Sequence, residues 1–346
     1  MSGGLRIQQF DWDLHPALVE LANTVHLPVM QNRQFLDHYY LGQEWSKLFL
    51  AMDDSKCLGI VGVDIFQFVT QTSSLKVSFA NNFYSLQPGI GGMLWLKSMK
   101  LGDIGLVFGG SKDAHRILSA RKFDYYSGVN IYRLNAQFEA YKEDSTLKGI
   151  VKAGLRPWAR KKLPEYASKD FLLRFADIQV VERQEVSEEM MVQTSSFTLR
   201  FRPSLEYLHW RYNPQLGYVH YRVFEILHSG LSCGCCILND GPKELVVVYA
   251  DGNDPKTLAA GILKAIFLIG EENDKNRTAV LASSHPAMRA VFTGSGFHLA
   301  EENYPFAAGS LRGSPRLGDP RTWLVNFGIG DNDLRPNMFW PTEGPR

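Results

Sequence analysis

The stretch from residue 75 to residue 101 constrains the fold of this chain more than any other. Its sequence, LKVSFANNFYSLQPGIGGMLWLKSMKL, predicts a strand, a glycine-bearing turn over residues 87–92 and a helix that begins at Ile90. The first N–H groups of a helix lack partners within the helix, and glycine lets a ligand approach them closely. Together with the helix dipole, this favours binding of a phosphate group. A turn of this kind can also be purely structural, so the elements around it must show whether it binds a ligand.

The elements around this turn follow a definite order. We expect, in the first half, a strand at 5–10, helices at 15–25 and 34–41, strands at 47–52, 58–70 and 75–83, a helix from Ile90, a strand at 104–108, a helix at 112–122 and a strand at 129–134. The run at 104–108 is continuously apolar, which is typical of a strand buried on both faces.

A similar order of elements returns after residue 170. We expect a strand within 171–184, helices at 186–197 and 204–212, strands at 218–227, 231–238 and 244–250, a helix at 255–269, a strand at 278–283, a helix from Pro286 and a strand at 322–327. Matching positions keep a nearly constant offset, since Tyr207 follows Phe35 by 172 residues and Phe297 follows Phe123 by 174. The chain is therefore interpreted as an internal duplication that forms two similar domains.

The predicted domain boundaries are 1–134 for the first domain, 135–170 for a linker and 171–346 for the second domain. The linker is polar and irregular, and its basic residues surround Trp158: Arg156, Arg160, Lys161 and Lys162. Basic residues around an aromatic ring can contact nucleic acid. However, the whole chain has 37 Lys and Arg against 36 Asp and Glu, so no overall field attracts a polyanion. A solvated linker is the favoured interpretation, and we expect no nucleic-acid partner.

The order of elements resembles that of the GNAT N-acetyltransferase superfamily over nearly the whole chain. The resemblance implies an α/β (α+β) fold with two GNAT-like domains, each with a mixed, mostly antiparallel central sheet flanked by helices. In that family, a Q/R-x-x-G-x-G/A turn holds the pyrophosphate of acetyl-CoA. Gly89-Ile90-Gly91 fits the G-x-G part, whereas Leu86 stands at the leading polar position and Gln87 comes one place later. The acyl-CoA contacts implied in the first half are Asn82, Phe83, Tyr84, Gln87, Gly89, Ile90, Gly91 and Gly92.

A second family signature is a helix that reads N-x-x-A-x-x-L-Y-x-x-x-G-F. Residues 285–297 match its ending, and the first half keeps Ala114 and Phe123. The tyrosine that commonly protonates the leaving thiolate corresponds to Leu118 in the first half and to Phe292 in the second. Both halves therefore lack the family's usual general acid.

The two halves differ at the expected phosphate turn. The second half has Asp251-Gly252-Asn253-Asp254-Pro255, where two carboxylates would repel a pyrophosphate. Asp254 suits the position that caps a helix, with proline at the first helical position. We therefore expect the acyl-CoA site in the first half and expect the second half to shape the acceptor pocket.

Asp64 is the candidate general base, because it is the single carboxylate in the apolar run 60–66. Burial there would raise its pKa toward a useful range, as catalysis of proton transfer requires. Alternatively, Asp64 faces solvent on an alternating strand. Tyr125 or Tyr126 could replace the missing acid, or they could be packing residues.

The candidate acceptor contacts are Arg211, Tyr212 and Glu225. The segment 210–214, WRYNP, resembles one in tandem GNAT-like proteins from cell-surface polysaccharide clusters, and Arg211 could clamp an anionic acceptor such as a nucleotide-linked sugar. The end of a helix explains this arginine equally well. Glu225 lies in a predicted strand, where a side chain that faces solvent is the default.

The remaining sequence features bear on metals and on membranes. Cys233, Cys235 and Cys236 are close together, but a zinc site needs a fourth ligand and usually a wider spacing, so we expect small buried residues and no metal. No run of 18 apolar residues occurs, and the N-terminus has no signal pattern. We therefore expect a cytoplasmic protein without a membrane partner. The sequence does not indicate an oligomeric state.

These observations favour an acyl-CoA-dependent N-acyltransferase, with acetyl-CoA or another acyl-CoA as co-substrate and an amine of a small molecule or sugar as acceptor. Two alternatives stay open. One is a Fem-type aminoacyl transferase that uses aminoacyl-tRNA. Such an enzyme needs a basic surface for tRNA, so the balanced net charge of this chain is evidence against it. The other is a binding protein that kept the fold and lost the chemistry, because fold alone does not fix function.

Overall fold

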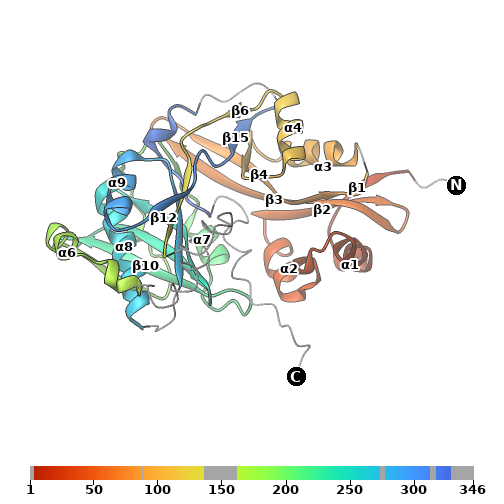
Figure 1. The fold of residues 1–346 in the computed structure, drawn as a ribbon. Helices are drawn as coiled ribbons and strands as arrows, with labels where there is room; N and C mark the ends of the chain where they lie inside the picture. The colour runs from red at the N-terminus through yellow and green to blue at the C-terminus, as the bar shows by residue number, and fades with distance from the viewer. Residues whose placement is uncertain (1–3, 88, 136–161, 273–276, 312–316, 329–346) are drawn as a thin grey trace, which may run out of the picture.

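The computed structural model describes residues 4–87, 89–135, 162–272, 277–311 and 317–328. Figure 1 shows two β-sheets beside each other, each with helices packed on it. Both sheets are mostly antiparallel, and each contains a parallel pair of central strands. The fold class predicted from the sequence is confirmed.

The first sheet has the strand order β1-β2-β3-β4-β5-β15-β6, with β9 paired to β3 and β16 paired to β9. Its strands are β1 (Arg6–Gln9), β2 (Ser46–Asp53), β3 (Lys56–Thr70), β4 (Ser74–Ser85), β5 (Ile104–Phe108), β6 (Asp124–Tyr125), β9 (Leu199–Phe201), β15 (Phe306–Gly309) and β16 (Trp323–Leu324). Strands β2, β3 and β4 are antiparallel, and β5 runs parallel to β4.

Four helices cover the two faces of the first sheet: α1 (His15–Thr24), α2 (Arg33–Tyr40), α3 (Ile90–Met99) and α4 (Lys112–Ala120). Side chains alternate along β3, so Val61 and Val63 pack with Leu94 of α3, while Ile60 and Phe66 join the core that contains α1 and α2. Figure 1 shows α1 and α2 below this sheet and α3 and α4 above it.

The second sheet has the order β14-β7-β13-β12-β11-β10-β8. Its strands are β7 (Asn130–Leu134), β8 (Ile178–Arg183), β10 (Tyr221–His228), β11 (Leu231–Asp240), β12 (Glu244–Gly252), β13 (Thr278–Ser283) and β14 (His298–Glu301). The accompanying helices are α6 (Lys169–Arg174), α7 (Leu205–Arg211), α8 (Pro255–Glu272) and α9 (Pro286–Gly294). Helix α8 is buried along most of its length against β8, β10, β11 and β12.

Each half contributes to the sheet of the other half, and two of the exchanged strands lie inside the strand order. Strand β7 lies between β13 and β14 of the second sheet, and β15 lies between β5 and β6 of the first. The predicted domain boundaries stay a prediction. Because strands are exchanged, no single division of the chain assigns all described strands of one sheet to one half. Of the predicted linker, residues 136–161 lie outside the described residues, and Arg156, Trp158, Arg160 and Lys161 lie among them.

Most of the predicted elements are present, but the helix predicted at 186–197 is wrong. Only the 3-10 turn Glu188–Met190 forms there. The rest of the segment bonds to a distant strand end instead, since the Ser195 hydroxyl donates to the Gly252 carbonyl and the Ser196 N–H to the Asn253 carbonyl. The strand predicted at 322–327 is limited to β16.

In the part of the chain that the structure describes, no helix combines the length and the apolar character needed to cross a membrane. The cytoplasmic location stays a prediction.

Candidate functional site

A cavity of about 690 Å³ opens where β4 and β5 diverge. These parallel strands pair only from Val77 and Ile104 to Phe79 and Leu106, and β4 then continues to Ser85 without β5 beside it. The cavity is lined by the end of β4, the first turn of α3, the end of β5 and the start of α4. Seven of the eight residues predicted to contact acyl-CoA line it: Asn82, Phe83, Tyr84, Gln87, Gly89, Gly91 and Gly92. The eighth, Ile90, packs into the core with Leu94.

The start of α3 lines this cavity through Gly89, Gly91 and Gly92. Gly89 has a φ of 88°, a left-handed conformation that favours glycine, and it precedes the first helical residue. A Cβ atom at Gly92 would meet nothing within 4 Å, and one at Gly91 would come no closer than 3.4 Å to the Phe83 ring. The N–H groups of Ile90, Gly91 and Gly92 therefore start a helix that is free of obstructing side chains, which suits a phosphate group.

Strand β4 carries a bulge beside the cavity. Ile60 of β3 pairs with Tyr84 and Gly62 with Asn81, so β4 has an extra residue between them. Asn82 has a φ of 43° at this bulge. The Tyr40 hydroxyl donates to Asn81 Oδ1 at 3.0 Å and accepts from Asn82 Nδ2 at 3.0 Å. Helix α2 thus fixes the bulge from the opposite face of the sheet.

Tyr304 lines the same cavity from the second half of the chain. It lies just before β15, and its ring packs edge-on against Phe108 with 5.1 Å between the ring centroids. A Cβ atom on Gly109 would lie 2.6 Å from the Tyr304 hydroxyl, which places that hydroxyl at the end of β5. Leu118, at the family's tyrosine position, lines the cavity from α4. Sequence reasoning missed Tyr304 because only the exchange of β15 brings it here, and no local motif marks it.

The corresponding gap in the second half is filled by the chain itself. Strand β12 pairs with β13 only from Glu244 to Val246. Beyond that point, the Gly328 N–H donates to the Val248 carbonyl, and Asn326 Nδ2 donates to the Ala250 carbonyl at 3.3 Å. The segment after β16 therefore bonds to the part of β12 that diverges from β13.

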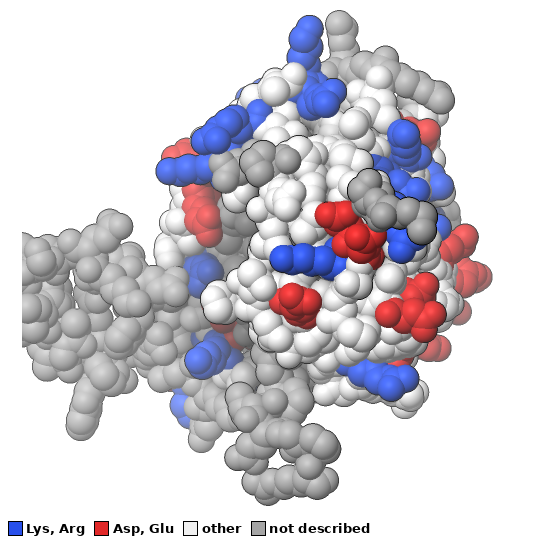
Figure 2. All heavy atoms as spheres, turned by 90° about the vertical axis from the view of Figure 1, so that its right-hand side faces the viewer, with Lys and Arg blue, Asp and Glu red and all other residues white. Residues whose placement is uncertain are grey.

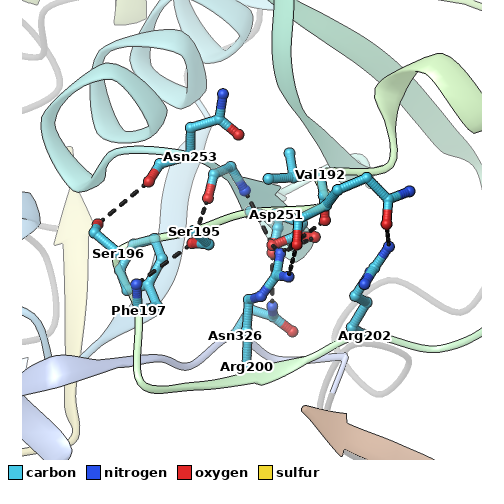
Figure 3. A network of polar contacts seen from close by, with 12 residues as sticks. Val192, Ser195, Ser196, Phe197, Arg200, Arg202, Asp251, Asn253 and Asn326 are labelled. Carbon is cyan, nitrogen blue, oxygen red and sulfur yellow. Dashed lines mark hydrogen bonds and ion pairs between the residues drawn. The ribbon is translucent and has the colours of Figure 1, made fainter. Parts of the chain in front are cut away.

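The turn before α8 is also bonded to other parts of the chain, and Figure 3 shows the contacts of Asp251 and Asn253 in this turn. Arg200 of β9 donates to both carboxylate oxygens of Asp251 at 2.8 and 2.9 Å, and burial raises the pKa of Asp251 despite this pairing. Asp254 accepts the N–H groups of Lys256 and Thr257 at 3.0 and 2.9 Å, as a helix cap. The first-turn donors of α8 thus bond to the chain's own carboxylate. The predicted capping role of Asp254 is confirmed.

Asp64 and Arg211 are predicted site residues that the structure brings together. Asp64 is fully buried, so the alternative that it faces solvent is wrong. Its carboxylate accepts from the Tyr39 hydroxyl and the Ser46 hydroxyl, both at 2.8 Å, and from Arg211 Nη1 at 3.3 Å. The Arg211 guanidinium also lies over the Tyr39 ring. This ion pair joins β3 and α2 of the first half to α7 of the second, and neither residue lines the cavity.

The other predicted residues lie apart from this cavity. Tyr212 is buried against Tyr221 and Tyr249. Two hydrogen bonds of 2.7 and 2.9 Å connect Glu225 to Arg183 of β8. The Tyr125 hydroxyl contacts His115 Nδ1 at 3.1 Å, and the Tyr126 hydroxyl accepts the Leu317 N–H at 3.4 Å. Burial raises the pKa of Tyr126.

The three clustered cysteines lie on β11, where Cys235 and Cys236 are fully buried. Burial raises the pKa of Cys233 to about 11. The prediction that Cys235 and Cys236 are small core residues is confirmed. Within the described ranges, no group of three or more His, Cys, Asp or Glu side chains is arranged to hold a metal ion.

Solved structures resemble this chain, whereas no protein-family model and no curated protein sequence matches it. A putative acetyltransferase from Pyrococcus horikoshii is 11% identical, with 96% of this chain and 97% of that one covered at a TM-score of 0.52. A GCN5-related N-acetyltransferase from Anabaena variabilis is 8% identical, with 88% and 72% covered at 0.52. A GCN5-related glucosamine N-acetyltransferase region of a fungal β-N-acetylglucosaminidase is 10% identical, with 89% and 38% covered at 0.53. At these identities, the shared property is the fold.

Proposed function

We propose that this chain, which has the fold of the GNAT acetyltransferases, is an acyl-CoA-dependent N-acyltransferase whose acyl-CoA site is the cavity between β4 and β5. The observation that carries this proposal is the contrast between the halves. Both have a strand, a turn and a helix in corresponding positions, but the first half leaves the strand edge and the helix start open to a cavity. In the second half, Asp254 and the segment after β16 bond to the equivalent backbone groups.

The residues of the cavity fit an acyl-CoA molecule. The N–H groups of Ile90, Gly91 and Gly92 would hold the pyrophosphate, since a helix start binds anions. The backbone of β4 beyond Phe79 would bond the pantetheine amides, and the bulge at Asn82 would lie beside the thioester. Acetyl-CoA is the donor that we propose first, with an amine of a small molecule or sugar as acceptor. The residues of the cavity would act by holding the thioester and the amine in position for attack. Such positioning can lower the free-energy barrier of the reaction by about 7–11 kcal/mol.

We also propose that Tyr304 supplies the proton for the leaving thiolate. It lines the cavity on the β5 side, where Leu118 replaces the tyrosine expected from the family pattern. Tyr125 and Tyr126 bond to His115 and Leu317 instead, outside the residues that line the cavity.

Tyr304→Phe should lower kcat for acyl transfer by about 10²-fold, the low end of the range for general acid catalysis, because a thiolate is a good leaving group. The Kd of acetyl-CoA should change little, since the ring and its packing on Phe108 are kept. The measurement is steady-state release of CoA with an amine acceptor. Tyr125→Phe is the matched control. A large loss in Tyr125→Phe and none in Tyr304→Phe would reinstate Tyr125 as the acid.

Calorimetry with acetyl-CoA tests the proposed function directly. We expect one site per chain, because only the first of the two corresponding gaps is open. Two sites would contradict the closure of the second half. Binding of aminoacyl-tRNA without binding of acetyl-CoA would favour the Fem-type alternative, and binding of neither would favour a protein that kept only the fold.

The distribution of charge bears on the Fem-type alternative. Figure 2 shows the face at the right of Figure 1, on which basic and acidic side chains are interspersed among uncharged ones. An interspersed surface gives no extended positive field for a polyanion. On this face, the described residues therefore favour a small donor over tRNA.

A further inference from the structure

A second cavity, of about 880 Å³, lies where the two halves of the chain meet. Its lining comes from β2, β3, β4 and their flanking residues in the first half and, in the second half, from α7 and the segments on either side of β9. Leu101, just after the end of α3, also lines it, so part of this cavity lies on the α3 face of the first sheet. Of the described residues, none lines both this cavity and the proposed acyl-CoA site.

Three polar side chains that line this cavity form a row across neighbouring strands: Arg202, Gln67 and Lys76. Gln67 of β3 pairs with Lys76 of β4, and on its other side the Arg202 N–H donates to the Gln67 carbonyl at 3.2 Å. Phe68 and Phe201, the next pair along, pack into the core on the α1 and α2 face. Because side chains alternate along a strand, Gln67 and Arg202 lie on the opposite face, with Lys76 beside them. The spacing of strands places the Cα atoms of Arg202 and Lys76 about 10 Å apart.

The row offers hydrogen-bond donors, with a positive charge at each end. The Gln67 amide oxygen accepts from the Ser74 hydroxyl at 3.1 Å, so its NH₂ group is the end that remains for a ligand. Arg202 Nη2 donates to Gln193 Oε1 at 2.9 Å, which holds the guanidinium and uses one of its five N–H groups. Lys76 adds an ammonium group, which has donors only. This set of groups favours an acceptor with negative charge as its partner.

Carboxylates also occur near this row. Glu44 and Glu188 line the same cavity and are exposed. Asp103 accepts the backbone N–H of Lys76 at 3.1 Å. Within the described ranges, neither Arg202 nor Lys76 forms an ion pair. Two cations held about 10 Å apart without a counter-charge in contact favour an anion between them.

We propose that this cavity is a second binding site, for a small molecule that carries an oxyanion on an apolar body. The oxyanion, a carboxylate or a phosphate, would lie over Gln67, where Arg202 and Lys76 would bind it from either side by charge-assisted hydrogen bonds. The apolar body would lie on Ile65 and Val69, which flank Gln67 on the same face of β3 and line the cavity. Because strands of the first sheet and the segment after β9 both line this site, its ligand would contact both halves of the chain.

Phenyl phosphate and phenylacetate are probes of this composition, a ring with an oxyanion. Titration of each into the whole chain, followed by saturation-transfer difference NMR of the ring protons, should show saturable binding. Binding should weaken as NaCl is added, because salt screens the attraction between the charges. 2-Phenylethanol, which has the ring without the charge, should not bind saturably. The ratio of the two Kd values distinguishes a carboxylate ligand from a phosphate ligand.

Two substitutions remove the charges of the row, and a third fills the site. Arg202→Gln and Lys76→Gln should each weaken probe binding by about tenfold or more, since each removes a charge-assisted hydrogen bond. Gln67→Glu places a carboxylate between the two cations, so it should abolish binding and raise Tm by pairing with them across the strands. Lys56→Gln is the matched control, because Lys56 is an exposed lysine at the start of the same strand and lies outside the lining of the cavity.

Binding of 2-phenylethanol as tight as that of the two anions would overturn the oxyanion site, and so would unchanged binding in Gln67→Glu. Absence of saturable binding of both anions to the wild-type chain would overturn the inference as a whole. Gly92→Asp should bind the probes as the wild type does, since Gly92 lines the acyl-CoA cavity and not this one. Loss of probe binding in that variant would assign the probes to the acyl-CoA cavity and overturn the second site, whereas binding of acetyl-CoA tests the proposed function separately.

Discussion

Gly92→Asp should lose acetyl-CoA binding while the stability of the chain is kept or increased. Gly92 is the third residue of α3 and lines the cavity, and a Cβ atom there would meet nothing within 4 Å. An aspartate in the first turn of a helix is favourable, by about 0.3–1 kcal/mol. The same carboxylate would lie where the pyrophosphate is proposed to bind, and like charges in contact cost several kcal/mol. We therefore expect affinity to fall by more than about 10³-fold.

Calorimetry for the Kd and thermal denaturation for Tm measure the two effects separately. Gly92→Asn is the matched control, because it has nearly the same shape without the charge and should keep a larger part of the affinity. If Gly92→Asp binds acetyl-CoA as tightly as the wild type, the pyrophosphate does not lie at the start of α3.

The local parts of this site were predictable from sequence. The alternation of β4, the glycines of the turn and the apolar residues of α3 lie within one stretch, and local pattern determines such elements well. Tyr304 was not predictable, because its place at the cavity depends on β15 entering a sheet built by residues far earlier in the chain.

The prediction of a helix at 186–197 was wrong for the same physical reason, namely contacts with residues far away in the sequence. Its apolar spacing is a local signal, whereas Ser195 and Ser196 bond to the end of β12, more than fifty residues later in the chain. Tertiary bonds of this kind override weak local preference. Asp64 is a comparable case. A carboxylate in an apolar run can face solvent or be buried, and its partner Arg211 lies 147 residues away.

Asp64→Asn should destabilise the chain by about 3–5 kcal/mol, because it removes a negative charge that is paired with the buried Arg211 guanidinium. The side chains of Asp64 and Arg211 are 0% and 1% exposed, so water does not screen the loss. Chemical denaturation would measure the change in the free energy of unfolding. Asp64→Asn combined with Arg211→Met should recover most of it, since both charges of the pair are then removed. The asparagine oxygen can still accept from one of the two hydroxyls, Tyr39 or Ser46, and its NH₂ group can donate to the other.

The double variant also decides whether Asp64 is the general base that its sequence context suggested. If the ion pair is structural, the folded double variant should transfer acyl groups at close to the wild-type kcat, because neither residue lines the cavity. If Asp64 takes the proton from the amine, the same folded protein should lose about 10²–10⁴-fold in kcat. Comparison of the two variants separates a loss of folded protein from a loss of proton transfer, since only the second persists after stability is restored.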